Sequence, residues 1–185
     1  MSRIPTPATI ADAPAATHAQ LEAVKKQLGT VPNMFRLIAT SPAALEGYLS
    51  LSGALAKGKL PPQTRERIAL AVAEINGCSY CLSAHTYLGR NLAKLDDAEI
   101  TANRNGASND TKADAAVRFA VQVLKARGHV SDAEFAAVGA AGYDHDQIIE
   151  IVQHVALNVW TNFFNETFKT DVDFPVITPA QSRAA

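Results

Sequence analysis

Residues 144–168 read DHDQIIEIVQHVALNVWTNFFNETF, and this segment is the most informative part of the sequence about the fold. Apolar side chains follow one another almost without a break from Ile148 to Phe164. A helix that is apolar on most of its sides is typical of a protein interior. We therefore predict one long helix from Asp144 to about Phe168, at the centre of the molecule.

Shorter helices are predicted on the N-terminal side of this stretch from their start and stop residues. Gly29 suits the left-handed residue that ends a helix, and Ser41 followed by Pro42 is typical of a helix start. Ser131 and Glu134 form a capping-box pattern. The predicted helices cover residues 18–28, 42 to about 57, 63–75, about 78 to 92, 112–127 and 131 to about 139.

The segments between these helices have the composition of turns and loops. Residues 29–33 and 58–62 are predicted turns, residues 96–99 a short turn or helix, and residues 103–110 a loop. Because no segment alternates as a strand does, we predict an all-α fold, a single-domain helical bundle of residues 18–176. Residues 1–17 are expected to form an extended N-terminal arm and residues 177–185 a C-terminal tail. This class excludes a thioredoxin fold, which needs a βαβ core.

The composition is that of an ordinary globular protein. The chain has 185 residues, 48% of them hydrophobic and 19% charged, with a formal net charge of -1. Because there is neither a global positive charge nor a dense Lys/Arg run, we expect no nucleic-acid or membrane-surface partner. No apolar segment reaches the roughly 18 residues that span a bilayer. The N-terminus has no apolar core of a signal peptide, so we expect a cytoplasmic location.

The two cysteines of the chain, Cys78 and Cys81, are three residues apart. A disulfide stabilises a fold mainly by closing a long loop, which this spacing cannot do. In a cytosolic chain, two cysteines at this spacing indicate redox or metal chemistry.

The segment from Cys78 to His85 combines the groups that thiol redox chemistry needs. On a helix, Cys78 and Cys81 are spaced i, i+3 and Cys81 and His85 i, i+4, so all three lie on one face. Cys78 follows the Asn76-Gly77 break, where the positive end of a helix favours a thiolate. His85 supplies a base or a hydrogen-bond donor. Reduction of a peroxide needs an attacking thiolate, a proton and a resolving thiol, and this segment contains all three.

A half zinc site is the main alternative for such a pair of cysteines. Cys78, Cys81 and His85 could bind one metal together with Glu66 or Glu74. Ligands of structural zinc, however, commonly come from two elements rather than from one helical face.

A family resemblance becomes specific at these residues. Arg65-Glu66 followed by Cys78-x-x-Cys81-x-x-x-His85 resembles the AhpD-like alkylhydroperoxidase group of the carboxymuconolactone decarboxylase superfamily. The resemblance extends over roughly residues 31–175 and is strongest to the subgroup called peroxidase-related proteins. Further matching segments are Val31-Pro32-Asn33-Met34-Phe35, Ser41-Pro42, Asn158-x-x-x-Asn162-x-x-Asn165 and Asp173-Phe174-Pro175.

The resemblance implies a fold, an assembly and a role for each site residue. It implies an all-helical fold assembled into trimers or hexamers. Cys81 matches the cysteine that attacks the peroxide, and Cys78 the partner thiol that closes the disulfide. His85 matches the histidine of the proton relay and Glu66 its acid. The implied partners are a small-molecule peroxide and an external dithiol reductant, and no haem, flavin or metal cofactor is required.

One position departs from the family pattern. The best-known peroxidases of the group have a histidine directly before the second cysteine, where this chain has Tyr80. A tyrosine hydroxyl donates a hydrogen bond but is a poor base at neutral pH. A disulfide oxidoreductase with little peroxidase activity therefore stays open as an alternative, and so does a non-catalytic oligomeric scaffold. The paired cysteines argue against lactone decarboxylation, because the decarboxylase branch lacks them.

Overall fold

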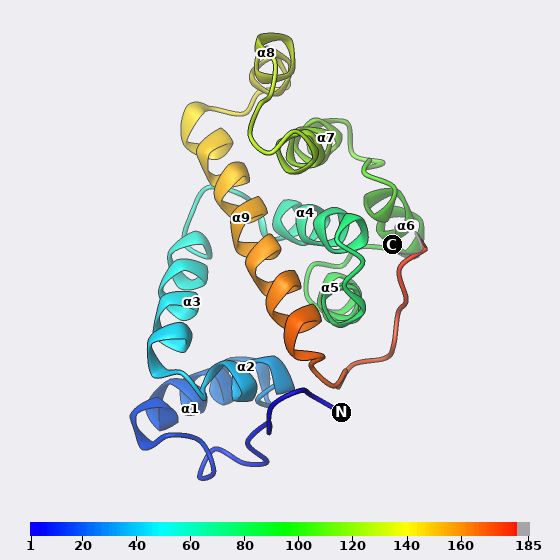
Figure 1. Cartoon of the computed structure of the whole chain (residues 1–185). Helices are drawn as coiled ribbons and strands as arrows, with labels where there is room; N and C mark the ends of the chain where they lie inside the picture. The colour runs from blue at the N-terminus through cyan, green and yellow to red at the C-terminus, as the bar shows by residue number, and fades with distance from the viewer. Residues whose placement is uncertain (181–185) are drawn as a thin grey trace.

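The computed structural model describes residues 1–180, so the last five residues of the predicted 177–185 tail lie outside the described part. Residues 1–180 form nine α-helices and one short 3-10 helix, and they contain no strand (Figure 1). The predicted all-α fold is confirmed. None of these helices is both long and apolar enough to cross a bilayer.

The helix boundaries agree with the predicted ones to within a few residues. Gly29 ends α1 with a φ of 79°, Ser41 accepts a hydrogen bond from the Ala44 amide, and Ser131 with Glu134 forms the capping box. In chain order the elements are η1 (Ala15–Thr17), α1 (His18–Leu28), α2 (Asn33–Ile38), α3 (Pro42–Leu55), α4 (Pro62–Ile75), α5 (Ser79–Asn91), α6 (Asp97–Arg104), α7 (Thr111–Lys125), α8 (Asp132–Ala140) and α9 (His145–Phe168).

Helix α2 is the α-helix that the sequence did not predict, and the 3-10 helix η1 lies within the predicted extended arm of residues 1–17. Helix α2 has six residues, which is too short for an apolar period to be recognised. Pro32 precedes it in an extended conformation, and Met34, Leu37 and Ile38 are buried. The start of the predicted 103–110 loop also differs, because residues 103 and 104 form the last part of α6.

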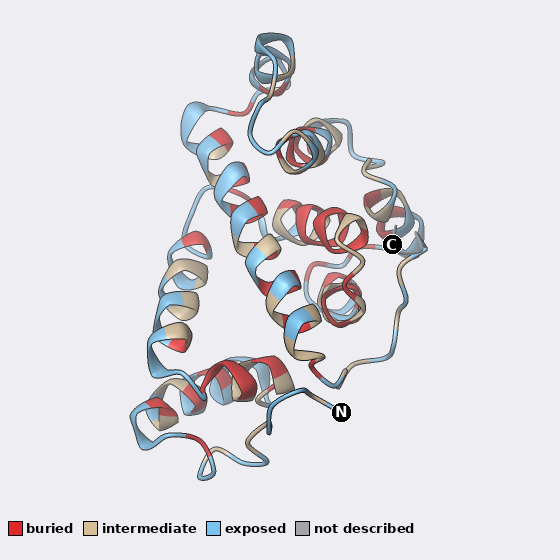
Figure 2. Ribbon diagram, in the orientation of Figure 1, coloured by how far each residue is buried: buried red, intermediate tan, exposed pale blue. Residues whose placement is uncertain are grey.

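The most enclosed helix is α4 rather than the predicted α9. Helix α9 crosses the molecule, drawn in orange in Figure 1, but leaves Ile149, Val152 and Phe163 exposed. Helix α4 packs against α5, α6, α7 and α9, and its residues from Ile68 to Glu74 are all buried (Figure 2).

Helix α4 also divides the interior into two apolar clusters. Leu70 and Ala73 belong to the cluster that contains Cys78 and Cys81. Other α4 side chains, among them Ile68, belong to the second cluster with residues of α7, α8 and α9. The cysteines therefore lie inside an apolar core and not on a surface loop.

The C-terminal segment returns along the molecule after α9, drawn in red in Figure 1. The Asp173 carboxylate accepts hydrogen bonds from the Asn33 amide, at 2.7 Å, and from the Tyr80 hydroxyl, at 2.9 Å. Further along, the Ala180 amide donates to Glu74 at 2.6 Å. These bonds attach the segment to α2, α4 and α5.

The buried carboxylate of Glu99 stabilises the loop between α6 and α7 through hydrogen bonds. It accepts hydrogen bonds from Arg67 at 2.6 Å, Asn103 at 2.9 Å, Ser108 at 2.5 Å and the Asn109 amide at 2.7 Å. Burial raises the pKa of Glu99, but the hydrogen bonds lower it by more, to about 2. The ionised form therefore stabilises the fold.

Replacing Glu99 with glutamine is expected to lower the free energy of unfolding at pH 7 by about 1 to 3 kcal/mol, because a charged acceptor is lost from buried donors. The pKa of Glu99 is lower in the folded state, so its contribution is full above the unfolded value of about 4.3 and disappears as the pH falls towards 2. Urea unfolding at pH 7 and pH 3 measures this, and the difference between wild type and variant should narrow at pH 3. Glu22→Gln, at an exposed position, is the control, and equal unfolding midpoints for the two variants would contradict the prediction.

Candidate active site

A sharp turn between α4 and α5 brings distant side chains of the two helices together. Gly77 has a φ of 66°, a left-handed conformation that favours glycine. The Cys78 amide donates to Ala73 O and the Gly77 amide to Glu74 O, which closes the end of α4. Helix α5 then returns along α4, so that Glu66 and His85, nineteen positions apart, come into contact.

The two cysteines are free thiols in hydrogen-bond contact with each other. Cys78 is the N-cap residue of α5, and its Sγ accepts a hydrogen bond from the Cys81 amide at 3.4 Å. Cys78 is fully buried and Cys81 is 3% exposed. The structure therefore brings the two sulfurs together in a nearly closed apolar environment.

The two thiols differ in their tendency to ionise. The hydrogen bond from Cys78 lowers the pKa of Cys81; burial opposes this, whereas His85 and Asn165 add to it, and the pKa falls to about 6. The pKa of Cys78 is raised, first because it donates to Cys81 and second because of burial.

These pKa directions favour the thiolate on Cys81, the attacking cysteine that the family resemblance implies, rather than on Cys78, where the helix terminus predicted it. The N-cap position gives Cys78 one backbone donor. The Cys81 sulfur accepts hydrogen bonds from the Cys78 thiol and from an asparagine amide, and the positive charge of His85 also stabilises its thiolate. Together these outweigh the effect of the helix terminus.

Glu66 orients His85 and raises its pKa. The Glu66 carboxylate lies 2.8 Å from His85 Nδ1, and both side chains are about one-fifth exposed, at 21% and 22%. Burial lowers the pKa of His85, but the charges of Glu66 and Cys81 and the hydrogen bond to Glu66 raise it by more. The arrangement favours an imidazolium beside a thiolate, an ion pair that can both attack and donate a proton.

Helix α9 contributes a group that the sequence analysis did not assign a role. Asn165 Nδ2 lies 3.3 Å from Cys81 Sγ and 3.3 Å from Met34 Sδ. Asn158, Asn162 and Asn165 are all buried. In the sequence, these three asparagines within an apolar segment could have indicated a polar contact in the core, because amides are rarely buried without a hydrogen-bond partner.

The other residues singled out from the sequence have different contacts. The Tyr80 hydroxyl donates to Asp173 and accepts from the Met34 amide, so it does not occupy the position of a proton donor to Cys81. Glu74, the alternative carboxylate, pairs with Arg104 at 2.7 Å. It therefore does not face His85.

The zinc alternative lacks a set of ligands. Within residues 1–180 no three His, Cys, Asp or Glu side chains are placed to hold a metal ion. Glu66 already binds His85 Nδ1, and Glu74 faces Arg104. The arrangement around the cysteines is suited to proton transfer.

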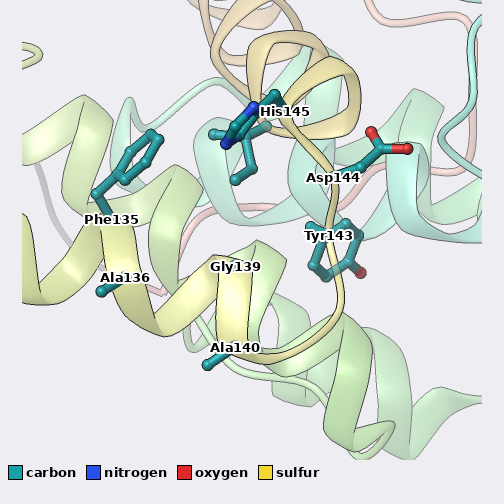
Figure 3. Close-up of a pocket in the computed structure, with 8 residues that line it drawn as sticks. Phe135, Ala136, Gly139, Ala140, Tyr143, Asp144 and His145 are labelled. Carbon is teal, nitrogen blue, oxygen red and sulfur yellow. The ribbon is translucent and has the colours of Figure 1, made fainter.

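Two surface cavities lie away from the sulfurs. One, of about 360 Å³, lies between α8 and the start of α9, where Phe135, Tyr143 and His145 line it (Figure 3). The other, of about 570 Å³, lies between α7, α9 and the end of α4. Neither is lined by Cys78 or Cys81, which are 0% and 3% exposed.

Comparisons with known proteins agree with this fold. The carboxymuconolactone decarboxylase family matches residues 42–126, a range that includes all four candidate residues. An uncharacterised protein of Haemophilus influenzae is 41% identical over 63 residues, which are 34% of this chain. That match spans half of the relative's length, 50%.

Solved structures are similar over nearly the whole chain. A peroxidase-related protein of Ralstonia eutropha JMP134, described as an alkylhydroperoxidase AhpD core, has a TM-score of 0.83 at 25% identity and covers 93% of this chain and 92% of its own. A peroxidase-related protein of Silicibacter sp. TM1040 has a TM-score of 0.78 at 23% identity, covering 99% and 100%.

A third similar structure is described by a different activity. It is a cysteine-to-alanine variant of the debrominase Bmp8 in complex with 2,3,4-tribromopyrrole, with a TM-score of 0.78 at 20% identity over 94% of both chains. At this identity the likeness concerns the fold alone. The family match over residues 42–126 and the structural neighbours together relate the chain to the carboxymuconolactone decarboxylase superfamily, and the structures of similar fold include ones described as AhpD-like and peroxidase-related.

Proposed function

We propose that this protein is a thiol-dependent peroxidase that reduces hydrogen peroxide or small organic hydroperoxides through Cys78 and Cys81. The observation that carries the proposal is the pair of sulfurs in contact, one of them acidic, beside a histidine held by Glu66. The descriptions of the neighbouring structures as peroxidase-related support the same class of reaction.

In the first step the Cys81 thiolate attacks the terminal oxygen of the peroxide. The S–O bond forms as the O–O bond breaks, and the leaving alkoxide takes a proton from the His85 imidazolium. Cys81 is then a sulfenic acid, His85 is neutral, and an alcohol or water has formed. The low pKa of Cys81 supplies the thiolate, and the raised pKa of His85 supplies the acid.

In the second step Cys78 resolves the sulfenic acid. Neutral His85 takes the Cys78 proton, the Cys78 thiolate attacks the Cys81 sulfur, and hydroxide leaves and is protonated to water. The peroxide has gained two electrons, and the dithiol has become a disulfide. An external dithiol, a protein or a small thiol, then returns two electrons and two protons.

Dithiol–disulfide exchange with little peroxidase activity is the second candidate. It is favoured by Tyr80, which replaces the family histidine and whose hydroxyl is occupied by Asp173 and Met34. In this case the same two sulfurs react, but with a disulfide rather than with a peroxide.

Mass spectrometry after addition of one equivalent of hydroperoxide to the reduced protein tests the proposal. We expect a mass decrease equal to two hydrogen atoms, a peptide in which Cys78 and Cys81 are linked, and full reversal by a dithiol. Oxidation by a small disulfide but not by peroxide would replace the peroxidase with the exchange reaction. A protein whose thiols stay reduced in both reactions would contradict both.

We also propose that the protein acts as a homo-oligomer in the cytoplasm. The assembly is supported by apolar side chains on the outer face of α9, where Ile149 is 66%, Val152 43% and Phe163 60% exposed. Apolar faces of this kind commonly mark contacts between subunits.

A further inference from the structure

Three buried asparagines on α9 differ in how their amides are satisfied. A buried amide without a hydrogen-bond partner destabilises a fold, so each of these amides is expected to have a partner. Asn158 finds its partner within α9, because its Nδ2 donates to His154 O at 2.8 Å. Asn162 and Asn165 instead direct their amides away from α9, towards the turn that carries the cysteines.

The Asn165 amide is directed at sulfur. Its Nδ2 is shared between Cys81 Sγ and Met34 Sδ, each at 3.3 Å. A thioether is a weak acceptor, so the charged Cys81 sulfur is the stronger partner. The Oδ1 atom of the same amide is buried and has no hydrogen-bond partner.

The Asn162 amide has a fixed orientation and an unused donor. Its Oδ1 accepts a hydrogen bond from Asn76 at 2.9 Å, which fixes the direction of Nδ2. Asn162 is fully buried, and this Nδ2 has no partner that meets the hydrogen-bond geometry. The amide nevertheless lies near enough to Cys81 to lower the pKa of its thiol.

We propose that Asn162 and Asn165 together bind Cys81 in two states of its reaction, first as thiolate and then as sulfenic acid. Asn165 Nδ2 donates to the thiolate. Oxidation adds an S–OH group, which can accept one hydrogen bond and donate another. The unused atoms match this need, since Asn162 Nδ2 is a donor and Asn165 Oδ1 an acceptor. The second half of this inference rests on the proposed peroxidase function, and the first half does not.

The thiolate half is tested without any peroxide. In a Cys78→Ser background Cys81 is the only thiol, and the pH dependence of thiolate absorbance gives its pKa. Asn165→Leu is expected to raise that pKa by about 1 to 2, because one charge-assisted hydrogen bond is lost. Asn158→Leu, on the same helix and equally buried but bonded to His154 O, is the matched control. Equal pKa values in the two variants would overturn this half.

A variant of nearly unchanged shape keeps the test decisive if Asn165→Leu does not fold. Asn165→Asp preserves the side-chain outline, removes the donor and adds a negative charge, so the Cys81 pKa should rise by more than in Asn165→Leu. An unchanged pKa in Asn165→Asp would overturn the assignment of Asn165.

The sulfenic-acid half is tested by the lifetime of the oxidised form. In the Cys78→Ser background, one equivalent of hydrogen peroxide should give a Cys81 sulfenic acid that a dimedone-type reagent traps. Asn162→Leu is expected to shorten its lifetime by about tenfold relative to Asn158→Leu, through the loss of one hydrogen bond to the sulfenic oxygen. Equal lifetimes would overturn this half. If the parent forms no sulfenic acid, the peroxidase proposal fails with it, and the thiolate measurement still decides the role of Asn165.

Discussion

Replacing Cys81 with serine is expected to lower peroxide consumption by about a thousandfold or more, because a serine hydroxyl is not ionised at neutral pH. The pKa of Cys81 is lowered to about 6, and the remaining thiol, Cys78, is fully buried, which disfavours its thiolate. Peroxide loss with a dithiol as reductant measures the effect.

Cys78→Ser separates attack from resolution. This variant is expected to reduce about one peroxide per molecule, in keeping with a single sulfenic acid, and then to stop until a thiol from solution reaches Cys81. If Cys81→Ser retained turnover while Cys78→Ser lost the first oxidation, the roles of the two cysteines would be exchanged. The unfolding midpoints of both variants provide the control for folding.

Replacing Glu66 with glutamine is expected to lower the peroxidase rate by about a hundredfold, within the range for general acid–base groups. The carboxylate charge raises the pKa of His85, and His85 lowers the pKa of Cys81. Without that charge, the pKa of the imidazole falls and that of the thiol rises, so the thiolate–imidazolium pair becomes scarce at neutral pH.

The pH profile distinguishes this effect from a loss of structure. In wild type, activity should rise as the pH passes about 6, where Cys81 ionises, and fall above the raised pKa of His85. In Glu66→Gln both limbs should move towards each other and the active range should narrow. Glu46→Gln, at an exposed position on α3, is the control. A lower rate with an unchanged profile would remove Glu66 from the proton relay.

The all-α fold could be predicted because the helix ends are determined by capping residues close to them in the sequence. Gly29, Ser41 and the pair Ser131 and Glu134 each mark a boundary within a few residues of it. Helix α2 could not be predicted, since six residues give no readable period and its stability comes from burying Met34, Leu37 and Ile38. The central position of α4 also depends on tertiary packing, because its sequence is less apolar than that of α9.

The candidate site could be predicted as far as it is local. Cys78, Cys81 and His85 lie within eight consecutive residues, and family spacing selected Glu66 over Glu74. The direction of the cysteine pKa difference could not be predicted, because it depends on the hydrogen bond between the two thiols, on burial, on the charge of His85 and on Asn165, 84 positions from Cys81 along the chain. That contact exists only once α9 has packed against α5.

In the proposed peroxidase cycle, the burial of both sulfurs requires two local openings of different size. A hydroperoxide of a few atoms needs only a brief displacement of side chains to reach Cys81, which is 3% exposed. A reductant must bring its own sulfur into line with the new disulfide, beside the fully buried Cys78. Oxidation should therefore select small reactants by size, whereas re-reduction should require the first turn of α5 to separate from its neighbours and should set the turnover rate.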